Sequence, residues 1–415
     1  MLNNNFNCLV KKYKKVWYSL DNKLNINLNT YSKLDKIQFE KEVAQIKIKI
    51  LDLLKTFPQS DIDRKTWSKN FKLNLISSIQ DISIDKNKVI KYFMDTGILE
   101  STNTFFSMSK NENLSIESLG QAIRNAWIMN ILQLIFQRNI ECSKSVFAYS
   151  MLYPYTDNYI DSNIEYTQKI SYSKNFLSRL NGNLVEPLND YEKNIFKMIK
   201  LIESEFNRND YIEVYESLIL IHNSQTNSLI QQNITIPFEK DILDIIFKKG
   251  GSSVLADGYL LSGQLTEIEF NFAVSFGILL QLCDDIEDIQ NDIDSKNATI
   301  FSLAANNKNL NLLANKLLNL VNYCFENDIS NFNFDNKENV TNFMYYCCNY
   351  LVIAGIISNK KYFNRKYVKY LQQFIPVRMN FIKKFTRNTK KEIDKILNMY
   401  DENTKKEMIN YINLL

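Results

Sequence analysis

Residues that break helices are scarce in this chain. Its 415 residues include only nine glycines and five prolines. Long stretches of apolar residues at helical spacing run between these few breakers, and the alternating pattern of strands between glycine-rich turns is missing. Because 45% of the residues are apolar, with 26 Phe and 23 Tyr, the chain can bury a large core. The sequence therefore predicts an all-α protein.

Several motifs that define common kinds of site are also missing. The six cysteines have no metal-binding spacing and stand mostly within apolar helical stretches, so we expect reduced, buried thiols. No glycine-rich phosphate loop and no RNA-binding motif occurs. The net charge of +4 is too small to indicate nucleic acid as a partner. A phosphate-loop enzyme, a zinc protein and a nucleic-acid-binding protein are all disfavoured.

Long hydrophobic runs are missing too. The N-terminal segment has no continuous apolar stretch of the kind that a secretory signal needs. No uninterrupted apolar run reaches the roughly 18 residues of a membrane-spanning helix. We therefore expect a soluble, cytoplasmic protein without a transmembrane segment.

Carboxylates, by contrast, gather in two clusters. In the first, Asp157, Asp161 and Glu165 follow one another at every fourth position. Residues four apart lie on one face of a helix, so this cluster predicts a stripe of like charge, which destabilises a helix by a few tenths of a kcal/mol per pair. A solvated acidic face is the ordinary interpretation of such a stripe, and a bound divalent cation is the functional one.

The second cluster differs because it ends a helix that we expect to be buried. Asp284, Asp288 and Asp292 have the same spacing, and Asp285 stands beside them. Thr266 with Glu269 predicts a capping box at the start of this helix, and the residues between are apolar nearly all round. Buried carboxylates must be paired or metal-bound. Mg²⁺ prefers carboxylate oxygens, keeps several waters and takes substrate phosphates at its remaining positions.

Around the second cluster the sequence resembles a known superfamily. Residues 276–288, Phe-Gly-Ile-Leu-Leu-Gln-Leu-Cys-Asp-Asp-Ile-Glu-Asp, are similar to the second aspartate-rich motif of class I isoprenoid synthases. This superfamily contains the trans-prenyl diphosphate synthases and the terpene cyclases. Residues 292–299 resemble the segment after that motif, where a Lys and a Thr recur, and 157–161 resemble a variant of the first motif with Asn158 in place of its second Asp.

A further resemblance lies upstream. Residues 247–258, with Gly250 and Gly251, resemble the kinked, small-residue helix that faces the substrate in this superfamily. These glycines also fit a second interpretation, in which they allow close helix packing. The motifs cover residues 117–300, and the rest of the chain agrees only in its helical character. The resemblance implies one large orthogonal helical bundle over residues 113–415, with residues 1–112 as an N-terminal helical extension packed on it.

The resemblance also implies an activity, namely Mg²⁺-dependent ionisation of a prenyl diphosphate. It implies three Mg²⁺ ions, with Mn²⁺ as a possible replacement, and it allows a homodimer. The basic segments that hold the second substrate in chain-elongating prenyl synthases are missing, so we favour a terpene cyclase over an elongating synthase. Two other interpretations stay open: a catalytically silent helical partner of such a synthase, and a helical scaffold whose acidic stripes bind basic partners.

The expected site residues follow from these patterns. Asp157, Asp161, Asp284 and Asp288 are expected to bind metal, together with Asp292 if the ligand set is shifted along the chain, as the cyclase-like Asn291-Asp292 segment suggests. Asp285 joins Asp157, Asp161, Asp284 and Asp288 in the expected catalytic set. The expected substrate-binding residues are Arg179, His222, Gln225, Lys249, Gln281 and Lys296. For His222 the alternative is a satisfied core residue, and for Lys249 an ordinary surface lysine.

Overall fold

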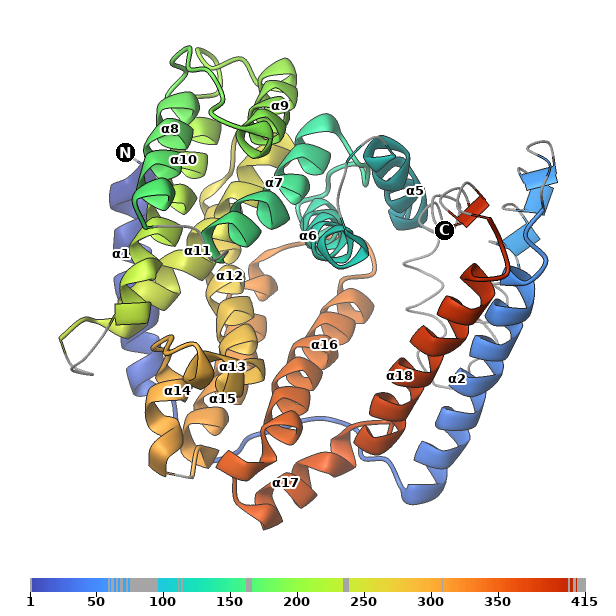
Figure 1. Ribbon diagram of the computed structural model, residues 1–415. Coiled ribbons are helices and arrows are strands. Elements are labelled where there is room, and N and C mark those ends of the chain that lie inside the picture. The colour runs from blue at the N-terminus through green and yellow to red at the C-terminus, as the bar shows by residue number, and fades with distance from the viewer. Residues whose placement is uncertain are drawn as a thin grey trace. The chain divides into compact units, whose positions relative to one another are not determined.

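The computed structural model describes most of the chain, and what it describes is helical. The described residues are 2–58, 60, 63–64, 66–67, 70–71, 74, 96–110, 112, 115–161, 166–233, 239–307, 309–401, 404–405 and 408, of which 116–117, 157–161, 166–167, 233 and 307 are described by their backbone only. All regular elements within these ranges are helices (Figure 1), which confirms the predicted all-α class. The chain forms two compact units: unit 1 comprises Met1–Asn27 and Leu114–Val368, and unit 2 comprises Leu28–Asn113 and Lys369–Leu415.

This division differs from the expected boundary at residue 112. The first helix, α1 (Leu2–Ser19), belongs to unit 1 because its apolar face, including Phe6, Tyr13 and Trp17, is buried against that unit's helices. Residues 369–415 belong to unit 2, where they pack with the segment expected to form the extension. An N-terminal extension and a continuous C-terminal domain are therefore not the two units that the structure has.

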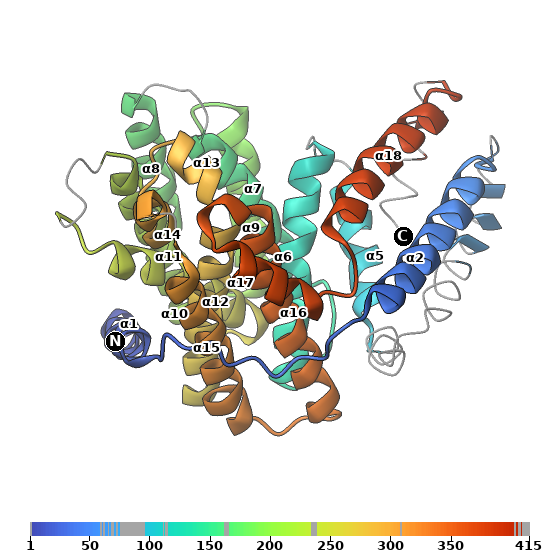
Figure 2. The ribbon, with the colours of Figure 1, turned by 90° about the horizontal axis from the view of Figure 1, so that it is seen from below.

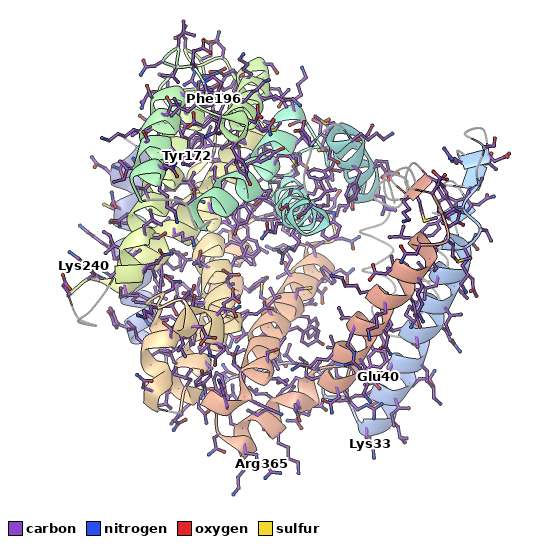
Figure 3. All side chains as sticks on the ribbon, viewed as in Figure 1. Lys33, Glu40, Tyr172, Phe196, Lys240 and Arg365 are labelled. Atoms are coloured by element: carbon purple, nitrogen blue, oxygen red, sulfur yellow. The ribbon has the colours of Figure 1, made fainter. Side chains whose placement is uncertain are left out.

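Unit 1 is built around two long central helices. Helix α12 contacts α11, α15, α16 and α1, and α11 also contacts α10, α7 and α6 (Figures 1 and 2). Tyr172 of α8 and Phe196 of α9, both labelled in Figure 3, are buried side chains of two further helices of this unit. The helices of unit 1 after α1 are α6 (Ile116–Ile135), α7 (Lys144–Asp161), α8 (Tyr166–Leu180), α9 (Asp190–Glu205), α10 (Ile212–Ser228), α11 (Ile242–Ser262), α12 (Glu267–Glu287), α13 (Ile289–Asp294), α14 (Ile300–Ala304), α15 (Asn311–Asn327) and α16 (Lys337–Ser358).

Helix α12 begins where the sequence predicts. The Thr266 hydroxyl accepts a hydrogen bond from the Glu269 backbone N–H, and the Glu269 carboxylate accepts one from the Thr266 backbone N–H, which completes the capping box. Most of the helix is buried, in agreement with its apolar sequence. The end of α8 has a local cause as well, because Gly182 follows it with a φ of 87°, a conformation that favours glycine.

Helix α16 is, among the described helices, the one long and apolar enough to cross a membrane. Its most apolar window has a mean hydropathy of 1.4, and 50% of that window is buried inside the protein. Within unit 1 this helix packs against α12 and α15. A core helix has the same length and composition, so α16 by itself gives only weak evidence for a membrane span.

Unit 2 contains a pair of long helices, α2 (Lys33–Leu54) and α18 (Met379–Leu397), that lie side by side in both views (Figures 1 and 2). Their contact buries an apolar cluster that includes Leu51, Leu54 and Ile396. Glu40 of α2, labelled in Figure 3, accepts hydrogen bonds from the Arg378 backbone N–H at 2.7 Å and from its Nε at 2.9 Å. Helix α5 (Ile98–Ser109) also belongs to this unit, and α17 (Arg365–Leu371) spans the boundary between the two units.

Candidate functional site

The second acidic cluster runs from the last turn of α12 into α13. Asp284 and Asp285 lie in the last turn of α12, Asp292 lies on α13, and Asp288 is the cap residue between the two helices. They differ in exposure: Asp285 is 4% exposed and Asp292 9%, whereas Asp288 is half-buried and Asp284 is exposed. One row of carboxylates therefore has a buried side and an accessible side.

Asp285 is the most deeply buried member of the cluster. Its Oδ1 accepts a hydrogen bond of 2.9 Å from Nε2 of Gln281, one helical turn earlier. Its Oδ2 is buried and has no hydrogen-bond partner among the described residues. Burial raises the pKa of the Asp285 carboxyl well above its usual value, and the nearby charges of Asp284 and Asp292 add to this effect. The ionised form of Asp285 thus needs additional positive charge.

Asp292 is buried but well held. Its Oδ1 accepts a hydrogen bond of 2.8 Å from Asn297 Nδ2, and its Oδ2 accepts one of 3.2 Å from the Thr299 hydroxyl. Burial raises the pKa of the Asp292 carboxyl and the charge of Asp288 adds to this, while the two hydrogen bonds oppose the rise. Asn297 and Thr299 thereby fix the orientation of the Asp292 carboxylate.

Lys249 of α11 is the basic residue of the site. Its positive charge lowers the pKa values of both Asp285 and Asp292, against the stronger effect of burial. The preceding Lys248 instead forms an ion pair of 2.8 Å with Asp244, on the same helix. Lys249 is half-buried. Lys249 therefore lies near the buried carboxyls, and whether it binds a substrate stays a prediction.

The position of Lys249 follows from the contact of two glycines. A Cβ atom added to Gly250 would overlap the carbonyl oxygen of Gly277, and one added to Gly277 would overlap that of Gly250. The backbones of α11 and α12 therefore touch directly. This confirms close packing as a role of the glycines. Helix α11 fills the space beside Gly277.

The loop after α13 carries Lys296, which is exposed and has a φ of 57°. Gln231, in the short 3₁₀ helix Leu229–Asn233, holds this loop by two reciprocal contacts. The Gln231 side chain donates a hydrogen bond of 2.8 Å to the Ala298 carbonyl, and the Ala298 N–H donates one of 3.0 Å to the Gln231 carbonyl. Gln231 was not among the expected site residues, because nothing in the local sequence indicates a partner 67 residues away.

The first acidic cluster is placed only in part. Asp157 and Asp161 lie in the last two turns of α7, whose backbone continues through Pro154. Their side chains, and the whole of Glu165, lie outside the described residues. Helix α7 packs against α11, the helix that carries Lys249. Whether these carboxylates face Asp284 and Asp288 stays a prediction.

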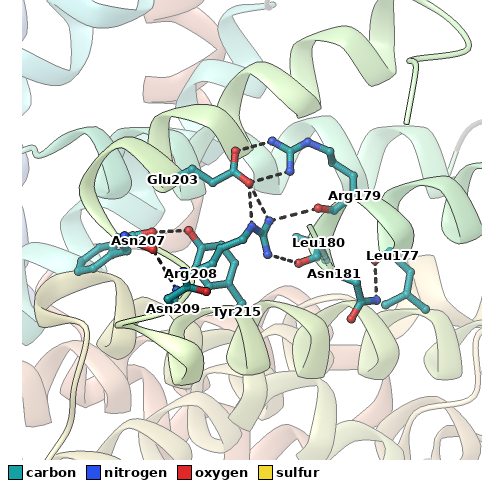
Figure 4. A network of polar contacts seen from close by, with 10 residues as sticks. Leu177, Arg179, Leu180, Asn181, Glu203, Asn207, Arg208, Asn209 and Tyr215 are labelled. Carbon is teal, nitrogen blue, oxygen red and sulfur yellow. Dashed lines mark hydrogen bonds and ion pairs between the residues drawn. The ribbon is translucent and has the colours of Figure 1, made fainter. Parts of the chain in front are cut away.

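Arg179 has a structural role, because it joins the end of α8 to α9. Its guanidinium donates two hydrogen bonds to the Glu203 carboxylate, one of them 2.7 Å long from Nη1 (Figure 4). Arg208 binds the same carboxylate through Nε at 2.9 Å, and its Nη1 donates to the Leu180 carbonyl at 2.6 Å. Burial raises the pKa of Glu203, but its bonds to the two arginines outweigh this and hold it below its usual value. Arg179 was expected to bind substrate, and its partner Glu203, 24 residues away, cannot be recognised from the local sequence.

His222 also lies in the protein core, which was the alternative interpretation for it. It is 3% exposed, its Nε2 lies 3.1 Å from the Ser173 hydroxyl, and its ring packs edge-on against Phe176. Burial lowers its pKa to about 4, so it is neutral at pH 7. Gln225, one turn further along α10, is half-buried, and its carbonyl accepts a bond from the Ser228 hydroxyl. Neither has a described contact with the aspartates of α12 and α13.

A second buried carboxyl lies deeper in unit 1. Asp257 of α11 is 1% exposed and accepts a hydrogen bond of 3.0 Å from Asn125 Nδ2, while its Oδ2 has no partner among the described residues. Burial raises its pKa well above the usual value. The sequence indicates that Asp257 is unusual, because it lies within the apolar run Val-Leu-Ala-Asp-Gly. It does not indicate that Asn125 is its partner.

No three His, Cys, Asp or Glu side chains come together as a possible metal site within the portion of the chain that the structure describes. The side chains of Asp157 and Asp161 are not among those compared. Comparisons of the chain with protein-family models, curated proteins and solved structures find no match.

Proposed function

We propose that unit 1 is a class I isoprenoid synthase of the cyclase type, which ionises a prenyl diphosphate and then cyclises or rearranges the allylic cation. The observation that supports this most strongly is the burial of Asp285 and Asp292 beside Lys249 at the end of a buried helix. Carboxylates in a nonpolar environment are costly unless positive charge offsets them. A solvated acidic face does not bury its carboxyls in this way.

The residues of the site fit Mg²⁺. Asp284 and Asp288 offer the hard oxygen donors that Mg²⁺ prefers, and Asp284 is accessible. The buried Asp285 Oδ2, which lacks a partner among the described residues, indicates a carboxyl that a cation nearby would stabilise in its ionised form. We propose that Asp284 and Asp288 hold the ions together with Asp157 and Asp161 of α7. Bound there, the metal would neutralise charge on the departing diphosphate.

The protein's own groups have distinct roles in this proposal. Lys249 and the exposed Lys296 bind diphosphate oxygens, since both are basic residues on segments that adjoin the aspartates. Gln281 orients Asp285, and the loop held by Gln231 orients Asp292 and Lys296. The apolar side chains of α11 and α12 exclude water from the allylic cation, because water would otherwise react with it.

Cyclase and chain-elongating activity are separated by one experiment. The protein is incubated with Mg²⁺ and C10, C15, C20 and C25 allylic diphosphates, with and without isopentenyl diphosphate, and products are identified by mass spectrometry. We expect diphosphate release from at least one allylic substrate without isopentenyl diphosphate. Turnover that requires isopentenyl diphosphate would instead establish an elongating synthase, which is the second candidate because residues 292–299 resemble that group.

A silent partner subunit and an acidic scaffold are tested by ligand binding alone. A ligand that binds only the folded state raises its melting temperature by mass action. We expect Mg²⁺ with pyrophosphate to raise the melting temperature of the protein. A scaffold should show no shift, and a silent partner should show no turnover with any substrate of the panel.

A further inference from the structure

Helix α18 of unit 2 carries a continuous row of cations. Lys383, Arg387, Lys391 and Lys395 follow one another at every fourth residue, and all four are exposed. We call these four residues the basic stripe. At 1.5 Å per residue the stripe extends over about 18 Å along one face of the helix. No ion pair joins any of the four to another residue of the described parts of the chain.

Helix α18 carries a strong excess of positive charge. Residues 379–397 contain six Lys or Arg and two Asp or Glu, a net charge of 6 − 2 = +4, which equals the net charge of the complete chain. The remainder of the chain therefore sums to zero. Like charges at this spacing destabilise a helix by a few tenths of a kcal/mol per pair. The four cations of the stripe therefore repel one another, whereas alternating basic and acidic residues would not.

Packing against α2 fixes the direction in which the stripe points. The apolar face of α18 contributes Ile396, Ile393 and Leu397 to the cluster shared with α2. At one end Arg378 binds Glu40, and further along Glu392 forms an ion pair of 2.7 Å with Lys47. The helix cannot rotate without breaking these contacts, so the stripe stays on the solvent side of the pair.

We propose that the basic stripe docks unit 2 onto an anionic lipid bilayer. A membrane rich in anionic lipid presents a plane of negative charge, so all four cations of a straight row can contact it at the same time. Each basic residue near such a surface adds favourable binding energy. Exposed apolar side chains lie near both ends of the helix, Ile382 at 36% exposure and Met399 at 69%. They would enter the boundary between headgroups and acyl chains. These apolar side chains favour a bilayer over nucleic acid, because a bilayer offers them an apolar phase.

Vesicle sedimentation tests this with the full chain. Vesicles of phosphatidylcholine with phosphatidylserine are compared with vesicles of phosphatidylcholine alone, and the test variant is K383Q/R387Q/K391Q/K395Q. The parent should bind the anionic vesicles and bind less tightly as salt is raised. The test variant should bind at least about 100-fold more weakly. Its circular dichroism and melting temperature should match or exceed those of the parent, because repulsion within the helix is relieved.

A charge-matched control separates the stripe from net charge. The variant K11Q/K15Q/K193Q/K200Q removes four exposed lysines of α1 and α9. It should sediment with anionic vesicles nearly as the parent does. The proposal is overturned if the parent ignores anionic vesicles, if the control loses as much binding as the stripe variant, or if the parent binds duplex RNA or polyglutamate but not the vesicles. These outcomes are independent of whether the protein turns over a prenyl diphosphate.

Discussion

Gly250 and Gly277 touch backbone to backbone, and this contact sets the geometry of the candidate site. Neither position has room for a Cβ, because the carbonyl oxygen of the other glycine occupies its place. The contact brings α11 and α12 together one residue away from Lys249 and two turns before Asp285. The distance between Lys249 and the buried carboxyls therefore depends on the absence of a side chain at both glycines.

Replacing either glycine by alanine should force the two helices apart. We expect Gly250→Ala and Gly277→Ala to destabilise the protein by about 1–3 kcal/mol, as overpacking of a core commonly does. Gly120→Ala in α6 is the matched control, since no atom lies within 4 Å of its added Cβ. Alanine there should stabilise by roughly 0.5–1 kcal/mol. Denaturant unfolding measures all three, and equal effects at positions 120 and 277 would contradict the close contact.

His222 predicts a dependence of stability on acid pH. Its pKa is lowered to about 4 in the folded protein, below the usual value, because the imidazole is buried. As pH falls, His222 therefore binds a proton in the unfolded chain before it does so in the folded protein. The folded state is fully favoured by the neutral ring above about pH 6.5, and this stability is lost between about pH 6.5 and 4. The loss should approach about 3 kcal/mol.

His222 is the only histidine in the chain, so its ring proton resonance reports on it directly. NMR titration should give a midpoint near 4. A midpoint near the value for exposed histidine, about 6.5, would show that the ring is not buried as the structure has it.

Asp257 predicts the opposite behaviour at higher pH. Burial raises its pKa, so the folded state keeps a proton that the unfolded chain releases, and stability falls as pH rises from the usual carboxyl pKa through the raised one. Asp257→Asn keeps the shape and can still accept the hydrogen bond from Asn125. We expect this variant to gain stability over the parent progressively as pH rises. If the unfolding free energies of the parent and of Asp257→Asn change in parallel from pH 5 to pH 9, Asp257 is not a buried, protonated carboxyl.

Arg179 should affect stability and leave substrate affinity alone. Arg179→Met removes the two hydrogen bonds to Glu203, which keeps Arg208 as a partner. We expect a loss of about 1–2 kcal/mol in unfolding free energy. The KM for the best diphosphate substrate should change by less than about twofold, as expected of a group that does not bind substrate. A tenfold rise in KM with unchanged stability would restore Arg179 to the substrate site.

The sequence predicted well what depends on local pattern. The capping box of Thr266 and Glu269 and the buried α12 each need only a few neighbouring residues to be recognised. It did not distinguish which aspartate faces the core. Because α12 is apolar nearly all round, its sequence does not fix the rotation of the helix, and the structure shows that Asp285 lies on the buried side.

Long-range partners were beyond the sequence for a related reason. Arg179 pairs with Glu203, which is 24 residues away, and Asn125 pairs with Asp257, which is 132 residues away. No periodicity connects such positions. The placement of α1 in unit 1 likewise depends on the tertiary packing of Phe6. The amphipathic pattern of α1 indicates that Phe6 is buried, but it does not indicate which helices cover it.

The central claim, that the carboxylates of α12 and α13 support ionisation of a prenyl diphosphate, is tested most directly by diphosphate release from two paired variants. Asp284→Ala and Glu287→Ala each remove one exposed carboxylate from the end of the same helix. Neither should melt below the parent without metal, since each relieves repulsion. With Mg²⁺ and the best allylic substrate, Asp284→Ala should lower kcat about 100-fold or more, and Glu287→Ala should stay within about threefold of the parent. Full activity in Asp284→Ala, or an equal loss in Glu287→Ala, would contradict the account.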